Sequence, residues 1–278
     1  MEDPRAQAGA TIGMDWGRRG AEAICRAGGV AVVVDVLSFT TTLTVAVDAG
    51  AEVYPFPFND ASASEFARLH RATLAVGRFE ARGSHPGEVS LSPASVRAAA
   101  GLARIVLPSP NGSALARVLA DRGVTVVGAA LRNRKAVARW LAGRLAAATR
   151  TLDTVAGQPG AGSTGAGSMT AVSAVAVIAA GERWADESLR PAVEDLWGAG
   201  AVIAAVRELT GAGLSQEARA AAAAFADVAA ELPACLADCA SGRELVAKGL
   251  AEDVAIAAEL DASHCVPVLS GQRFVNAG

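Results

Sequence analysis

The segment VAVVVDVLSFTTT, residues 30–42, contains the pattern that decides the fold. Its first seven residues are apolar and mostly β-branched apart from Asp35, which is typical of a strand that is buried on both faces. The hydroxyl residues that follow indicate the first turn of a helix. A buried strand that leads directly into a helix is the repeating unit of a parallel sheet.

The same alternation of short apolar segments and Ala-rich amphipathic segments continues along the chain. It predicts an α/β fold of three layers, α/β/α, with helices on both faces of a largely parallel or mixed sheet. The predicted strands are residues 30–36, 51–56, 73–76, 103–107, 124–128, 172–179 and 266–269. The predicted helices are residues 41–49, 60–71, 112–121, 134–148, 189–209 and 216–230, with a final helix that starts at a capping box, Ser241 to Glu244.

The length and composition predict one α/β unit over residues 1–278, since 278 residues with 52% hydrophobic content can bury a large core. A low-complexity stretch of Gly, Ala and Ser at 156–169 is typical of a loop. It is therefore a candidate boundary between two similar lobes, residues 1–155 and 170–278.

The charge and residue counts exclude several classes of protein. A net charge of −3 argues against binding to nucleic acid. The sequence contains no run of 18 uncharged apolar residues, so we expect no membrane span. The N-terminus lacks the apolar core of a secretory signal, so we expect a cytoplasmic protein. Three His and four Cys favour oxygen ligands and a hard cation for any metal site. The Ala-rich helix at 216–230 packs either in the core or against a second copy, which would give a homodimer.

The loop after the first predicted strand carries the strongest candidate residue, Asp35. In a parallel sheet, ligands bind beyond the carboxyl ends of the strands. A carboxylate at the end of a buried strand loses several kcal/mol of hydration, so we expect a cation or strong hydrogen-bond donors beside it. The four hydroxyls that follow either cap the helix or bind an anionic ligand: Ser38, Thr40, Thr41 and Thr42.

Three further polar clusters also follow predicted strands. Asn111 and Gly112, with Ser109 and Ser113, form either an ordinary turn or a site for an anion. Glu182 follows a later strand, and the adjacent acids Glu194 and Asp195 precede small and apolar residues, so we expect at least one of them to face a site. Arg78 could hold a phosphate or carboxylate through two parallel hydrogen bonds.

Six segments, taken together, resemble the motifs of the 2-phosphosulfolactate phosphatase family in their order and spacing. They are DVLSFTTT (35–42), PNGSAL (110–115), LRNRKAVA (131–138), AAGE (179–182), VEDLWGAG (193–200) and SGREL (241–245). The resemblance spans nearly the whole chain. Asn133, in the third segment, is a further candidate substrate-binding residue.

The resemblance implies a Mg²⁺-dependent hydrolysis of the phosphate monoester of a 2-hydroxy-3-sulfo acid, which yields sulfolactate and phosphate. Our hypothesis is that Asp35 shares the Mg²⁺ with one of Glu194 and Asp195. The hydroxyls of the first loop and the N–H groups around Asn111 and Gly112 would then hold the phosphate. Whether Asp35 is itself phosphorylated stays open at this point.

The chain departs from the family pattern at two positions. Ser38 and Phe39 stand where many members have Arg-Ala, and Leu91 stands where an Asn is common. A related small phosphorylated acid is therefore an alternative substrate. The missing arginine also favours a second function, a non-catalytic homologue of the same fold that binds a small anion.

Overall fold

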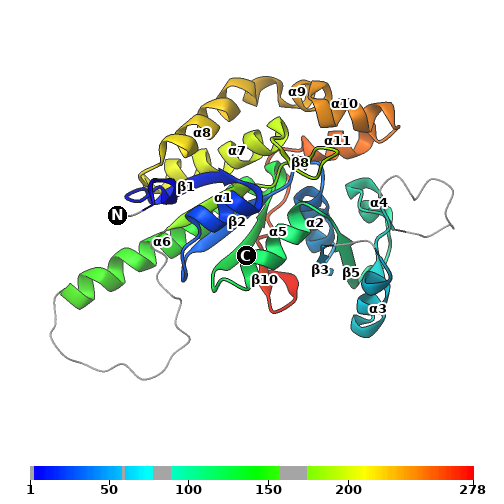
Figure 1. Cartoon of the computed structure of the whole chain (residues 1–278), viewed down its shortest axis with the longest axis horizontal. Helices are drawn as coiled ribbons and strands as arrows, with labels where there is room; N and C mark the ends of the chain where they lie inside the picture. The colour runs from blue at the N-terminus through cyan, green and yellow to red at the C-terminus, as the bar shows by residue number, and fades with distance from the viewer. Residues whose placement is uncertain (1–2, 58–59, 78–88, 157–173) are drawn as a thin grey trace.

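The computed structural model describes residues 3–57, 60–77, 89–156 and 174–278, with side chains up to residue 148 in the third range (Figure 1). Within these ranges one sheet has the strand order β1-β7-β2-β6-β10-β11-β3-β5-β4, and β8 and β9 form a separate hairpin. The strands are β1 Ile12–Trp16, β2 Val30–Val34, β3 Glu52–Phe56, β4 Thr73–Leu74, β5 Arg104–Pro108, β6 Thr125–Ala129, β7 Val175–Ala179, β8 Glu182–Arg183, β9 Leu189–Arg190, β10 Pro267–Ser270 and β11 Arg273–Asn276. The α-helices are α1 Gly17–Ile24, α2 Phe39–Asp48, α3 Ala61–His70, α4 Pro93–Ala98, α5 Gly112–Ala120, α6 Arg134–Ala156, α7 Val193–Thr210, α8 Gln216–Val228, α9 Leu232–Asp238, α10 Ala240–Ala247 and α11 Ala251–Ala257, and the 3-10 helices are η1 Pro4–Ala6, η2 Leu131–Asn133 and η3 Ala229–Glu231.

The sheet consists of two parallel groups of strands that an antiparallel hairpin connects. In the first group, β1, β7, β2 and β6 are parallel and in register, so that Val34 lies opposite both Ala179 and Ala129. In the second group, β3, β5 and β4 are parallel. The hairpin β10–β11 joins the two groups by antiparallel pairing on both sides. Val268 of β10 pairs with Val127 of β6, and Phe274 of β11 pairs with Val53 of β3. The sheet is therefore mixed but largely parallel, as the sequence predicts.

Helices cover both faces of the sheet, which gives the expected three layers (Figure 1). Alternate residues of β2 face opposite layers: Val32 and Val34 pack in one core with residues of α6, α7 and α8. Ala31 and Val33 pack in the other core with residues of α1, α2 and α5. Because both faces are buried, the strand has the continuous apolar sequence that identified it. The fold class and all seven predicted strands are confirmed.

The structure corrects several predicted element boundaries. The helix predicted from residue 189 begins at Val193, since residues 182–190 contain the β8–β9 hairpin instead of the acidic first turns of a helix. The predicted capping box at Ser241 is wrong as well. Helix α10 begins at Ala240, and its cap is Cys239, whose Sγ accepts a hydrogen bond from the N–H of Gly242 at 3.3 Å. A further helix, α11, follows it.

Strand β7 comes late in the sequence but lies between two early strands, β1 and β2. Strand β7 pairs with both β1 and β2, so strands from before and after the Gly/Ala/Ser-rich stretch alternate in one sheet. Most of that stretch, residues 157–173, lies outside the described residues. The division into two lobes stays a prediction.

The Ala-rich helix α8 lies against α7 at very short range. A Cβ at Gly200 of α7 would overlap the carbonyl group of Ala221, so only a glycine there allows the two helices this contact. Among the described residues one stretch, Gln216–Asp238, is long and apolar enough for a membrane span by length and composition alone. It comprises α8, η3 and α9, and one of its faces, with Ala221 and Phe225, is packed in the core. A homodimer through the other face stays a prediction.

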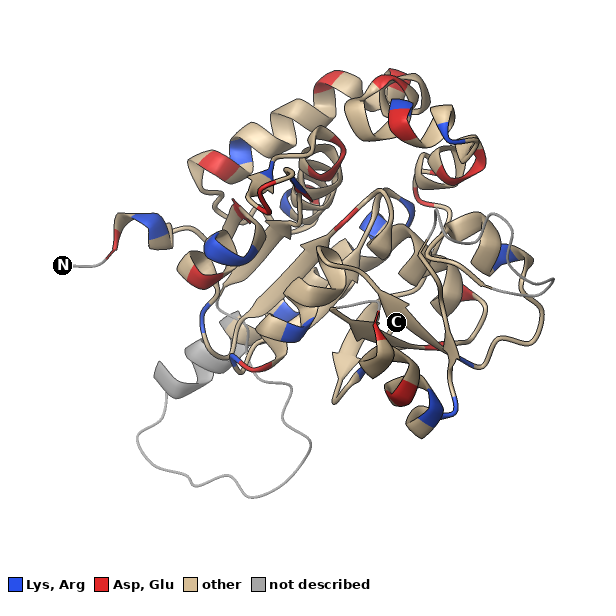
Figure 2. Ribbon diagram, turned by 45° about the vertical axis from the view of Figure 1, so that its right-hand side comes forward, with Lys and Arg blue, Asp and Glu red and all other residues tan. Residues whose placement is uncertain are grey.

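Acidic and basic side chains are mixed over the described surface. Figure 2 shows Lys and Arg interspersed with Asp and Glu along the outer helices. This distribution agrees with the small net charge of −3. The expectation that the protein does not bind nucleic acid stays a prediction.

Candidate active site

The carboxylate of Asp35 connects the loop after β2 to the start of α5. Its Oδ1 accepts the N–H of Phe39 at 3.1 Å, and its Oδ2 accepts the N–H of Gly112 at 2.9 Å. These are the strong donors that the sequence predicts for a buried carboxylate, because the first N–H groups of a helix have no partner inside the helix. Asp35 is only 6% exposed. The structure thus brings two of the predicted loops together.

Gly112 is required by this contact. A Cβ at this position would lie within 2.6 Å of Asp35 Oδ2 and would also overlap the ring of Phe39. Any other residue would push α5 away from the β2–α2 loop. The Asn111-Gly112 pair resembles an ordinary turn in the sequence. In the structure, Gly112 is needed because only a residue without a side chain lets the backbone at the start of α5 approach Asp35 this closely.

Asp195 connects the loops after β2 and β7 in the same way. Its Oδ1 accepts the N–H of Val36 at 2.7 Å, and its Oδ2 accepts the N–H of Gly181 at 2.8 Å. Asp195 lies in the first turn of α7, where the dipole of that helix also stabilises a negative charge. The candidate residues from three separate parts of the sequence therefore meet at the ends of β2 and β7.

Asp35, Glu194 and Asp195 form a cluster of buried acids, here called the acidic cluster. Burial, together with the nearby charges of Asp35 and Glu194, raises the pKa of Asp195 well above its ordinary value, although the two backbone N–H groups oppose this shift. In the part of the chain that the structure describes, no Lys, Arg or His forms an ion pair with Glu194 or Asp195. Ionisation of Asp195 is therefore costly in the protein alone, and a bound cation would favour its ionised form.

The hydrogen-bond partner of Glu194 is a thiol. Cys239 Sγ lies 3.6 Å from Glu194 Oε2 and 3.2 Å from the carbonyl oxygen of Leu236, so its single proton is donated to one or the other. Burial, and next the charge of Glu194, raises the pKa of Cys239 to about 12, so the thiol keeps its proton and can donate it. Because a thiol is a weak donor, Glu194 is held less firmly than the two aspartates. We regard it as the carboxylate of the cluster that is best placed to change partners when a cation binds.

Three of the four predicted loop hydroxyls are already used inside the protein. They donate to backbone carbonyl oxygens: Ser38 to Leu91, Thr40 to Asp35 and Thr41 to Val36. Thr42 differs, since its Oγ1 is fully buried and has no hydrogen-bond partner among the described residues. An unpaired buried hydroxyl costs stability, so it is a good candidate for contact with a ligand.

We expect Thr42→Val to separate binding from stability. The substitution removes an unpaired hydroxyl, so the free energy of unfolding should rise by about 1 kcal/mol in a urea titration. If Thr42 contacts the phosphate, kcat/KM should fall by about tenfold. Thr44→Val is the matched control, because the hydroxyl of Thr44 donates to the carbonyl of Thr41 at 2.7 Å and its loss should lower stability. A less stable Thr42→Val protein with full activity would contradict this role.

Asn111 and Glu182 also come together. Asn111 Nδ2 donates to Glu182 Oε2 at 2.8 Å, and Asn111 Oδ1 accepts from Arg183 Nε at 3.3 Å. Arg183 was not among the predicted residues, although it directly follows Glu182 in the same loop. The three residues border one cavity beside the loops that hold the acidic cluster.

Other predicted residues have structural partners. Ser113 Oγ donates to the carbonyl of Leu107, and Ser109 Oγ accepts the N–H of Asn111 at 3.3 Å. The N–H groups of Asn111 and Gly112, predicted to hold phosphate, thus already donate inside the protein. Asn133 is fully buried, and its side chain bonds the backbone of Ala130, Gly128 and Cys265. Arg78 lies outside the described residues.

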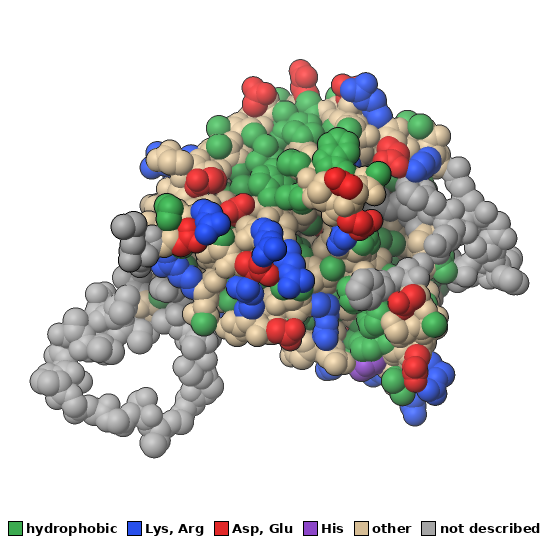
Figure 3. Space-filling view, viewed as in Figure 1, with side chains coloured by type: hydrophobic (Ala, Val, Ile, Leu, Met, Phe, Trp, Pro, Cys, Tyr) green, Lys and Arg blue, Asp and Glu red, His purple; other side chains and the backbone are tan. Residues whose placement is uncertain are grey.

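A cavity of about 680 Å³ adjoins these loops, between α1, α5 and the β8–β9 hairpin. Asn111 and Glu182 contribute to its wall, together with Arg117 of α5, which has no local signal in the sequence. Figure 3 shows basic side chains gathered on this face over α1 and α5, below a hydrophobic area. We name this cavity the arginine-lined cavity.

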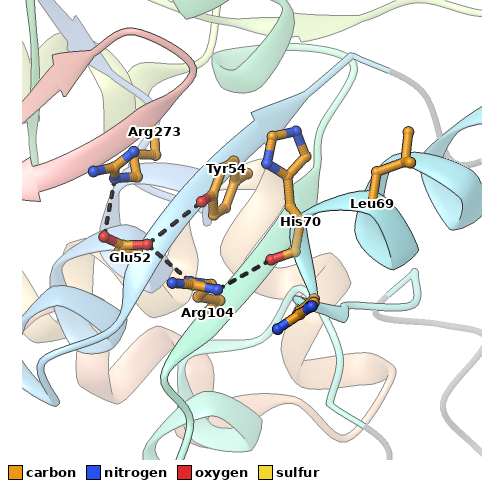
Figure 4. Close-up of a pocket in the computed structure, with 7 residues that line it drawn as sticks. Glu52, Tyr54, Leu69, His70, Arg104 and Arg273 are labelled. Atoms are coloured by element: carbon orange, nitrogen blue, oxygen red, sulfur yellow. Dashed lines mark hydrogen bonds and ion pairs between the residues drawn. The ribbon is translucent and has the colours of Figure 1, made fainter.

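A second, shallower cavity of about 310 Å³ lies at the beginnings of β3 and β5 (Figure 4). There the Glu52 carboxylate lies between Arg104 and Arg273, with each N–O distance 3.0 Å. The hydroxyl of Tyr54 donates to the same carboxylate at 3.4 Å. These two arginines are already paired within the protein, so the arginine-lined cavity is the better candidate for a ligand.

The acidic cluster suits a metal ion that needs few ligands from the protein. Among the described residues, no three His, Cys, Asp or Glu side chains are arranged to hold a metal by themselves. Mg²⁺ does not require this, because it is usually bound by one or two carboxylates, several waters and a substrate phosphate. The buried carboxylates of Glu194 and Asp195, without a cationic side chain among their described neighbours, fit that mode of binding.

A protein-family model described as 2-phosphosulpholactate phosphatase matches residues 21–150 and 165–272 of the chain. The two matched segments contain Asp35, Asn111, Gly112 and the pair Glu194 and Asp195. No curated protein matches the chain.

Proposed function

The chain belongs to the 2-phosphosulpholactate phosphatase family, and from this membership we propose that it is a Mg²⁺-dependent phosphatase of a small phosphorylated 2-hydroxy acid. The substrate is 2-phosphosulfolactate, which would give sulfolactate and phosphate, or a related acid. We also propose a cytoplasmic location for the enzyme.

The observation that carries this proposal is the position of the acidic cluster. Glu194 and Asp195 are 2% and 3% exposed, and they lie beside Asp35 at the start of helix α7. Buried like charges are costly, and proteins that keep them at the ends of strands commonly use them to bind cations or to perform chemistry. A phosphate monoester brings further negative charge, so its approach needs a cation at this place.

Each of the residues would have a distinct role. Bound Mg²⁺ would offset the charge of the phosphate and polarise its oxygens. Glu194 and Asp195, with Asp35, are the carboxylates that would hold the ion. The Thr42 hydroxyl, which is buried without a hydrogen-bond partner among the described residues, would donate to a phosphate oxygen. Hydrolysis adds the oxygen of water to phosphorus, breaks the ester P–O bond and gives the proton to the departing alkoxide.

Asp35 can also be considered as a nucleophile. Both of its oxygens accept backbone N–H groups, which fix the plane of the carboxylate but leave a lone pair on each oxygen. Phosphorylation of Asp35 would convert one charged acceptor oxygen into an ester oxygen, which weakens the hydrogen bond that this oxygen accepts. Direct attack by water therefore requires less rearrangement of the loops, and we propose it as the mechanism.

The alternative function is that of a small-anion-binding protein without turnover. It is favoured by the commitment of most loop hydroxyls and N–H groups to partners inside the protein. Such a protein would bind phosphate or an acid but release no product.

The test is release of inorganic phosphate from a panel of phosphorylated 2-hydroxy acids that includes 2-phosphosulfolactate. We expect turnover with Mg²⁺ and none with EDTA. If no member of the panel is hydrolysed while calorimetry still detects binding of phosphate or of the acids, the binding protein is the correct reading. If EDTA leaves turnover unchanged, the metal assignment is wrong.

A further inference from the structure

The arginine-lined cavity is larger than a three-carbon acid requires. Its volume of about 680 Å³ lies within the range of pockets that enclose drug-sized ligands, roughly 300 to 1,000 Å³. Its inner wall includes Ala180, Asn111 and Glu182, which are direct neighbours of the glycines that donate to Asp195 and Asp35. The three acids themselves do not line the cavity, so a phosphate ester would be held at the loops between them and would extend its organic part into this space.

The walls of the cavity are mostly apolar. Trp16 at the end of β1, Leu115 and Val118 of α5, and Leu189 of β9 all line it. Leu189 is 43% exposed although it is a large hydrophobic residue. An apolar wall gains free energy only from an apolar ligand, because it cannot replace the hydrogen bonds that a polar group makes with water.

One arginine that lines the cavity, Arg117, has no acidic partner among the described residues and could pair with an anionic ligand. Four arginines line it, and three have acidic partners: Arg18 and Arg19 pair with Glu22, and Arg183 pairs with Glu187. Arg117 is half-buried and forms no ion pair with the residues that the structure describes. Asp121, the C-cap residue of α5, also borders the cavity and is exposed. A planar guanidinium in this position suits a carboxylate or sulfonate.

We infer that the substrate is a related acid rather than 2-phosphosulfolactate itself, namely a phosphorylated 2-hydroxy acid with an apolar body of about ring size and a further anionic group at its far end. The body lies in the arginine-lined cavity, and the far anion meets Arg117. This inference rests on the proposed function, and it makes Arg117 and the apolar wall the residues that determine specificity.

The test compares three probes, the O-phosphates of lactate, of 3-phenyllactate and of 3-(4-carboxyphenyl)lactate. We expect kcat/KM to rise about tenfold from the first to the second, because a ring buries apolar area, and again from the second to the third. Arg117→Gln should abolish the second gain. Arg139→Gln is the matched control, since Arg139 is an exposed residue of α6 that does not line the cavity.

A second variant tests the size of the cavity. Ala114→Phe places a ring in the cavity and should reduce the ratio of kcat/KM between phenyllactate phosphate and lactate phosphate to about one. Equal kcat/KM values for the three probes with the wild-type protein would overturn the inference. So would an Arg117→Gln protein that keeps the preference for the carboxyphenyl probe.

Failure of the proposed function would give a different result. If no probe releases phosphate, calorimetry with unphosphorylated 3-(4-carboxyphenyl)lactate still tests the cavity. Binding by the wild-type protein that Arg117→Gln weakens about tenfold supports the inference without turnover. Absence of binding, or equal binding by the two proteins, overturns it.

Discussion

Replacing Asp35 by Asn is expected to lower kcat/KM for phosphate release by about a thousandfold. The substitution removes one charge from the acidic cluster, so the cation loses a ligand. It also turns an NH₂ group toward the N–H of Phe39 or of Gly112, both of which need an acceptor. The unpaired donor should lower the free energy of unfolding by about 1 to 3 kcal/mol. Phosphate release and urea titration measure the two effects separately.

Asp60→Asn is the matched control for this variant. Asp60 also accepts N–H groups at the start of a helix, those of Ser62 and Ala63, but it lies at the exposed end of α3. Asn is a good helix cap, so activity and stability should both change little. An Asp35→Asn protein with wild-type turnover would remove Asp35 from the proposed mechanism, whatever its stability.

Removing Mg²⁺ is expected to have the second large effect. EDTA should abolish turnover, and saturating Mg²⁺ at about a hundred times its dissociation constant should stabilise the protein by about 2.7 kcal/mol. The physical reason is the repulsion among the buried carboxylates when they are ionised, which a bound cation offsets. The measurement is the melting temperature across a Mg²⁺ titration. Glu194→Gln should flatten this titration, and Glu208→Gln, at the distant end of α7, should not.

The raised pKa of Asp195 predicts how the Mg²⁺ effect depends on pH. The folded protein without metal binds a proton at Asp195 more tightly than the unfolded chain does. Its stability therefore decreases as the pH rises from the ordinary carboxylate pKa toward the raised value. Mg²⁺ needs the ionised carboxylate, so its stabilising effect should grow over the same range. A Mg²⁺ effect that is independent of pH would contradict binding at Asp195.

The sequence identified the long central elements because their patterns are strong. The run from Val30 is apolar throughout, since β2 is buried on both faces. Strand β1 was missed because Gly13 and Asp15 interrupt a short segment at the edge of the sheet. The β8–β9 hairpin was interpreted as part of a helix because its acidic residues resemble a first helical turn. In the structure each strand of the hairpin is two residues long, and the turn between them contains Glu187, which has a positive φ of 64°.

The candidate site was only partly visible in the sequence. Asp35 and Asp195 could be found because a charge next to apolar residues needs an explanation. Their pairing with N–H groups across 77 and 14 residues depends on the three-dimensional arrangement. Asn133 shows the opposite error, since a buried amide that bonds three backbone groups looks the same in sequence as one that binds a ligand. Arg117 has no local signal, because only the cavity distinguishes it from other helical arginines.

The position of β7 has a consequence for biosynthesis. A ribosome must complete at least 179 residues before the strand that separates β1 from β2 can be inserted. Until then the edge of β2 exposes unpaired N–H and C=O groups, and contacts over such sequence separations form slowly. A nascent chain that stops before Val175 should therefore associate with chaperones or aggregate, whereas one that extends through α8 contains the strand and the helices that cover it.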